Sequence, residues 1–100
     1  MKPLLTAAAL CLAATSTAFA ADPNLGRNLA ATCANCHGTN GQALAGSGID
    51  ALAGVDKAKI LQKLADFKSG VKPASIMHQI SKGYTDEQLD LIAAYYAAQK

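Results

Sequence analysis

Two cysteines and a histidine in the pattern C-x-x-C-H constrain this chain more than any other feature. They are Cys33, Cys36 and His37. On a helix, residues three and four apart lie on one face, so the two thiols and the imidazole point the same way. This pattern is typical of covalent haem attachment. The sequence therefore predicts one haem c, bonded to Cys33 and Cys36, with His37 as an axial iron ligand.

The first twenty residues have the pattern of an export signal. Lys2 supplies a positive charge, residues 4–14 form a short apolar core, and residues 18–20 form an A-x-A cleavage site. An uncleaved membrane anchor is the alternative, because the apolar run approaches spanning length; the polar residues 15–17 argue against it. We therefore expect residues 1–20 to be a cleaved secretory signal peptide and the mature protein to be periplasmic, without stable insertion in the membrane.

The remaining chain, residues 21–100, is expected to form one monohaem domain. Its only cysteines are Cys33 and Cys36. A disulfide between them could form in an exported protein, but a bridge that closes so small a loop stabilises little. A chain of about 80 residues is near the size at which an apolar core alone is marginal. A covalently held haem would add a large buried apolar body, which favours haem attachment over a structural disulfide.

Three helical segments are predicted, and no alternation of period two indicates a β-sheet. They lie at about residues 24–36, at about residues 56–69 and from residue 85 onward. Thr85 and Gln88 have the spacing of a capping box at the start of the last helix. The predicted fold class is all-α, arranged around a cofactor.

Irregular chain is predicted between these helices. Residues 38–54 are rich in glycine and lack periodicity, so we expect a loop that wraps the haem. Asp56 can cap the start of the middle helix and Gly70 can close its end. Residues 71–76 then break the helical pattern and lead to Met77 in a non-helical approach.

The second axial position of the iron has few candidate ligands. Beyond residue 20, Met77 is the only methionine and His78 is the only histidine besides His37. Methionine raises the reduction potential of a haem, whereas a second imidazole would lower it. Ligand preferences of haem iron favour Met77 over His78, although Met77 could also be an ordinary core residue.

The chain resembles the class I c-type cytochromes. The matching segments are residues 26–29 and 33–37 near the front, and residues 85–88 with Tyr95 near the back. The resemblance implies three main helices wrapped around one covalently bound haem. It also implies an axial methionine shortly before the last helix, where Met77 stands, and packing of Gly26 in the first helix against Tyr95 in the last.

Three segments carry a narrower resemblance, and they are residues 66–70, 72–77 and 82–87. They are similar to the cytochrome subunit of flavocytochrome c sulfide dehydrogenase and to the c4 and c553 cytochromes. The resemblance implies a non-enzymatic carrier of single electrons whose partner is a redox protein, with a sulfide-oxidising flavoprotein as the sharper expectation. A free shuttle to a terminal oxidase or another cytochrome is the alternative.

The chain departs from these families at the residue that would accept a hydrogen bond from His37. Relatives usually carry a proline shortly before the segment that appears here as residues 52–54, and a proline carbonyl often accepts the proton of the proximal imidazole. This chain has Asp50 in that region. The acceptor for His37 therefore stays open: the Asp50 carboxylate could serve, or Asp50 could be a solvated loop residue.

Charge and composition weigh against other classes of function. The net charge is +2, with no basic block and few aromatic residues, which argues against a nucleic-acid partner. Six lysines between residues 57 and 82 face one acid, Asp66. They could ring the haem edge and steer an acidic partner, or they could form a scattered solvated surface.

Two further classes are alternatives to electron transfer, namely a haem protein with a labile sixth site and a zinc or redox module. A haem with a labile sixth site could bind gas or peroxide if Met77 dissociated easily. A zinc module would need finger spacing, which Cys33, Cys36, His37 and His78 do not follow, and a thioredoxin-like module would need a strand-helix-strand context that is absent.

Overall fold

The computed structural model describes residues 22–100, so the predicted signal peptide at residues 1–20 lies outside the described residues. The helices are α1 (Leu25–Ala30), α2 (Ala34–His37), α3 (Lys57–Ser69), α4 (Met77–Lys82) and α5 (Asp86–Ala97), with 3-10 turns at Ala31–Cys33 and Thr39–Gly41. No β-strand occurs between residues 22 and 100. The prediction of an all-α fold is confirmed.

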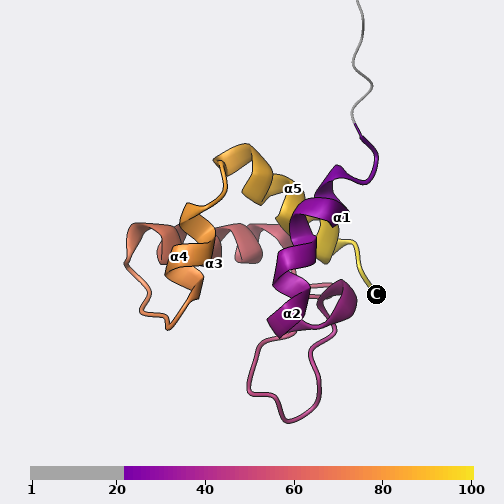
Figure 1. Cartoon of the computed structure of the whole chain (residues 1–100), viewed down its shortest axis with the longest axis horizontal. Helices are drawn as coiled ribbons and strands as arrows, with labels where there is room; N and C mark the ends of the chain where they lie inside the picture. Colours follow the sequence, from indigo (N-terminus) through magenta and orange to yellow (C-terminus); the bar gives the residue numbers. More distant parts are fainter. Residues whose placement is uncertain (1–21) are drawn as a thin grey trace, which may run out of the picture.

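Three pairs of helices pack together, and two of these pairs include α5 (Figure 1). α1 packs across α5, and α3 packs against both α4 and α5. The crossing of α1 and α5 depends on Gly26: a Cβ atom there would lie 3.1 Å from the Leu91 carbonyl oxygen and 3.6 Å from the Tyr95 Cβ. A larger residue would push the helices apart, so the predicted packing of Gly26 against Tyr95 is confirmed.

The apolar core lies where these helices meet. Its buried members are Ala30, Ile60, Leu64, Leu89, Ile92, Ala93 and Tyr96. Tyr96 is 1% exposed, and its hydroxyl donates a hydrogen bond to the Ala30 carbonyl oxygen at 2.7 Å. This bond ties α5 to the end of α1, directly before the C-x-x-C-H segment.

Most of the predicted helix boundaries hold. Thr85 and Gln88 form the predicted capping box, with reciprocal bonds of 2.9 and 3.1 Å. Gly70 ends α3 with a φ of +82°, a left-handed conformation that glycine adopts without strain. Asp56 occupies the N-cap position of α3, but its side chain makes no capping hydrogen bond.

Two features of the prediction were wrong. The first predicted helix is interrupted by the 3-10 turn at residues 31–33, and α4 was not predicted at all. Met77 is the first residue of α4 rather than part of a non-helical approach. A helix of six residues is too short to show an apolar period, and helices of this length depend on packing, which α3 supplies here.

Two connections extend on the same side of the molecule in Figure 1, namely the loop before α3 and the loop between α3 and α4. Both contribute residues to the cavity described below. Within the described range, none of the helices has the length and apolar character that crossing a membrane would require.

Candidate haem site

A cavity of about 350 Å³ brings the predicted haem-binding residues together. Cys33, Cys36 and His37 line it from the 3-10 turn and α2, and Met77 lines it from the first turn of α4. Its volume lies within the range typical of cofactor pockets. Most of its wall is apolar and comprises, among others, Leu52, Val55, Ile60, Leu64, Phe67, Ile80 and Ile92. An apolar cavity with two thiols, an imidazole and a thioether fits a covalently bound haem.

Both cysteines on the cavity wall carry free thiols. Cys36 is exposed, whereas Cys33 is half-buried beside Tyr96. Burial raises the pKa of the Cys33 thiol above its usual value, because the thiolate would lose hydration there. Cys33 is therefore protonated at neutral pH in the haem-free chain. The two thiols lie where they could bond to the edge of a group held in the cavity.

The imidazole of His37 is held by the loop that precedes α3. Its Nδ1 lies 2.7 Å from the backbone carbonyl oxygen of Asp50. A carbonyl oxygen can only accept a hydrogen bond, so Nδ1 carries a proton, and in the neutral imidazole Nε2 then keeps its lone pair. Nε2 is thus the atom available to a metal, and a hydrogen bond of this kind is the usual orienting contact of a metal-binding histidine.

The open question of the histidine's acceptor is thereby answered. Asp50 serves through its backbone carbonyl, and the suggestion that its carboxylate accepts the proton is wrong. The carboxylate instead lies 3.7 Å from Lys63 Nζ, and the Asp50 side chain is 77% exposed. Every residue has a backbone carbonyl, so no residue type marks a backbone acceptor. The sequence could therefore indicate the region around Asp50 but not which of its oxygen atoms accepts the hydrogen bond from His37.

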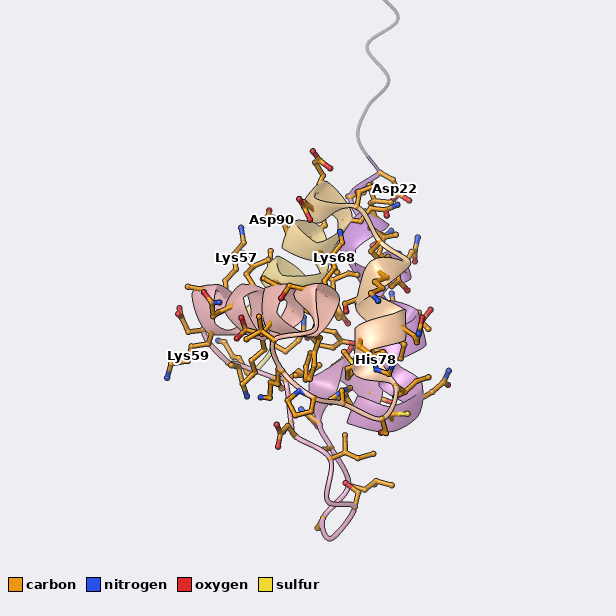
Figure 2. All side chains as sticks on the ribbon, turned by 90° about the vertical axis from the view of Figure 1, so that its left-hand side faces the viewer. Asp22, Lys57, Lys59, Lys68, His78 and Asp90 are labelled. Carbon is orange, nitrogen blue, oxygen red and sulfur yellow. The ribbon has the colours of Figure 1, made fainter. Side chains whose placement is uncertain are left out.

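Met77 and His78 differ in where they lie, although they are neighbours in the sequence. Met77 lines the cavity and packs against the core. His78 follows it in α4 (Figure 2) and does not line the cavity, and its Nδ1 is buried without a hydrogen-bond partner. Of the two neighbours, Met77 alone is among the residues that line the cavity. The structure places Met77 there.

Only two of the six lysines between residues 57 and 82 line the cavity, namely Lys63 and Lys72. Lys57 lies on α3 and forms an ion pair with Asp90 of α5 at 2.9 Å (Figure 2). Such exposed pairs contribute little to stability. The other four of these lysines do not line the cavity.

A second pocket in the described part of the chain is less suited to haem. A groove of about 510 Å³ lies between α3 and α5, and its lining residues are Leu61, Ala65, Lys68, Ser69, Asp86 and Leu89. It is lined by no cysteine, histidine or methionine, which are the side chains that would bind haem iron or form thioether bonds to haem. Within residues 22–100, no three histidine, cysteine or acidic side chains gather as they would around a metal ion.

Residues 24–98 match the Cytochrome c family. The match covers most of the chain, so the chain belongs to the cytochrome c family and its cofactor is haem c. The prediction of a monohaem c-type cytochrome is confirmed.

Three relatives are similar to this chain. One is the thiosulfate dehydrogenase electron acceptor of Stutzerimonas stutzeri, 40% identical over 69% of this chain and 32% of the relative. Another is the cytochrome subunit of sulfide dehydrogenase of Chlorobaculum tepidum, 39% identical over 71% of this chain and 63% of the relative. Cytochrome c4 of Pseudomonas aeruginosa is 36% identical over 100% of this chain and 50% of the relative. The chain thus spans about a third to two thirds of the length of these relatives.

Proposed function

We propose that this protein carries single electrons between redox proteins through one haem held by four residues of the cavity. The observation that carries the proposal is the convergence of Cys33, Cys36, His37 and Met77 on one apolar cavity. When bound, the haem supplies an iron that gains and loses one electron. The protein residues then have three tasks, which are to hold this group, to orient it and to exclude water.

Each site residue has a distinct role in this proposal. The sulfurs of Cys33 and Cys36 hold the haem through two thioether bonds. His37 binds the iron through Nε2, because its Nδ1–H is engaged by the Asp50 carbonyl oxygen. The Met77 thioether would be the second side chain that holds the iron, and a histidine–methionine pair would favour the reduced iron and a high potential.

The cavity wall supports electron transfer rather than substrate chemistry. Its titratable side chains other than the four binding residues are Asp50, Lys63, Lys72 and Tyr96. Lys63 is near the Asp50 carboxylate, and the Tyr96 hydroxyl donates to a backbone carbonyl. Two axial protein ligands would also leave the iron without an open position for a substrate. No general base or nucleophile is therefore poised over the iron.

Export is part of the proposal. Residues 1–20 would be the signal peptide, cleaved after Ala20, and the mature protein would act in the periplasm, where its haem is attached. The positively charged start, the apolar core and the A-x-A site support this assignment.

The partner in this proposal is another redox protein, and a flavoprotein that oxidises sulfide is the preferred candidate. The similarity to a cytochrome subunit of sulfide dehydrogenase supports this choice. A free shuttle between a dehydrogenase and another cytochrome is the alternative, and the similarity to a thiosulfate dehydrogenase electron acceptor favours it. Association with a flavin-containing protein that survives purification at moderate salt would distinguish the first arrangement from the second.

A potentiometric titration of the purified haem protein tests the carrier function itself. We expect one reversible couple with a slope of about 59 mV per tenfold change in the ratio of oxidised to reduced protein, as for a single electron. We also expect the reduced protein to bind no carbon monoxide at neutral pH. Ready binding of carbon monoxide would instead indicate an open iron and a gas-binding or peroxide-reacting protein.

A further inference from the structure

We propose that Ser81 is a positioning residue whose buried hydroxyl keeps Met77 at the cavity. The inference rests on the proposed role of Met77 as an axial ligand. Ser81 lies in α4 and is 0% exposed. Its Oγ donates a hydrogen bond to the backbone carbonyl oxygen of Met77 at 2.6 Å and lies 3.4 Å from that of His78. The hydroxyl therefore ties the last part of a short helix to the residue at its start.

Met77 occupies a position that would otherwise be weakly held. α4 has six residues, and a helix of this length is not stable on its own hydrogen bonds. Met77 is its first residue, in the turn where helices fray. The N-cap residue, Ile76, is half exposed and provides no side-chain cap. The Ser81 hydroxyl supplies a side-chain hydrogen bond to this turn.

Serine at position 81 makes α4 less stable than alanine would. Alanine is the better helix former, and a serine that bonds back to the carbonyl four residues earlier slightly destabilises a helix. Burial of the hydroxyl adds a desolvation cost that only a good hydrogen bond offsets. The stability of α4 alone would favour alanine at position 81. The benefit of the hydroxyl therefore lies in where it holds the Met77 backbone.

Loss of the hydroxyl should increase the fraction of time that the Met77 thioether is away from the iron. An added ligand such as imidazole competes with the thioether, so its apparent affinity reports that fraction directly. One buried hydroxyl-to-carbonyl bond contributes about 1 kcal/mol, which corresponds to about fivefold in an equilibrium constant. We therefore expect S81A to bind imidazole about fivefold more tightly than the wild type.

The experiment is an imidazole titration of the oxidised, haem-loaded protein, followed by loss of the weak far-red absorption band of methionine-ligated haem. S69A is the matched control, because the Ser69 hydroxyl also bonds back to a carbonyl of its own helix, that of Asp66 at 3.3 Å, but at an exposed position. S69A should match the wild type. A purely global destabilisation by S81A would leave the unfolded fraction negligible at 25 °C and could not raise the affinity.

The possible results separate this inference from the proposed function. A far-red band in the wild type, with about fivefold tighter imidazole binding in S81A alone, supports the role of Ser81. A band in the wild type with equal affinities in all three proteins overturns the role of Ser81 and leaves Met77 as the ligand. Absence of the far-red band in the wild type would show that Met77 is not an iron ligand, which would also overturn the role of Ser81.

Discussion

The Nδ1 atom of His37 and the backbone carbonyl oxygen of Asp50 lie 2.7 Å apart, although the two residues are thirteen positions apart in the sequence. This contact places a proton on Nδ1 of an imidazole that lines the cavity. The Asp50 side chain points to Lys63 instead, so one residue contacts the histidine through its backbone and α3 through its carboxylate. Of the two contacts, only the backbone one involves the imidazole.

The first prediction concerns this carboxylate. D50N keeps the backbone carbonyl and weakens only an exposed ion pair, so the reduction potential should stay within a few millivolts of the wild type, and stability should fall by less than about 0.5 kcal/mol. Protein-film voltammetry and chemical unfolding would measure the two quantities. For a one-electron couple, 59 mV corresponds to a tenfold change in the equilibrium constant. A change in reduction potential approaching this size would show that the carboxylate acts on His37.

The second prediction concerns the crossing of α1 and α5. In G26A, the new methyl group would lie 3.1 Å from the Leu91 carbonyl oxygen, so the free energy of unfolding should fall by about 1–3 kcal/mol. N28A, at an exposed position of the same helix, is the control and should change stability by less than about 0.5 kcal/mol. Equal effects of the two substitutions on unfolding by guanidinium would contradict the close approach at Gly26.

The third prediction concerns the hydroxyl that joins α5 to α1. Y96F removes the buried bond to the Ala30 carbonyl oxygen and should cost about 1–3 kcal/mol of stability. Y95F is the matched control, because the Tyr95 hydroxyl bonds to the Asn40 side chain at a more exposed position. It should cost less than Y96F. Thermal unfolding of the two haem-loaded variants measures both losses of stability. Equal losses would show that the buried Tyr96 bond contributes no more than the more exposed Tyr95 bond.

The fourth prediction separates the two candidate ligands of α4. M77H should keep a low-spin haem but lower the reduction potential markedly, since a second imidazole replaces the thioether. H78A should leave the spectrum and the potential unchanged, because His78 does not line the cavity. Absorption spectra and voltammetry of both variants provide the measurement. Loss of the low-spin spectrum in H78A, together with its retention in M77A, would reverse the assignment.

The features predicted correctly from the sequence are those that depend on neighbouring residues or on one strong motif. Thr85 and Gln88 bond within a single turn, and Gly70 ends a helix through its own backbone conformation. The side chains of the C-x-x-C-H segment share a face because of helix geometry. Local rules were sufficient for these features.

The remaining features depend on packing between distant segments. α4 is too short to show a period and gains its stability from α3. The acceptor for His37 is a backbone carbonyl, which every residue has, so no side chain could mark it. Met77 and His78 are adjacent, and only the orientation of α4 against the cavity distinguishes them.

The most direct test of this account is the absorption spectrum of the matured, oxidised protein in the far red. Ligation by Met77 predicts a low-spin haem with the weak far-red band of methionine-ligated ferric iron, and loss of this band in M77H but not in H78A. A low-spin spectrum without the band would assign the position to another ligand. A high-spin spectrum would mean an open iron and would contradict a carrier whose two axial positions are both filled by the protein.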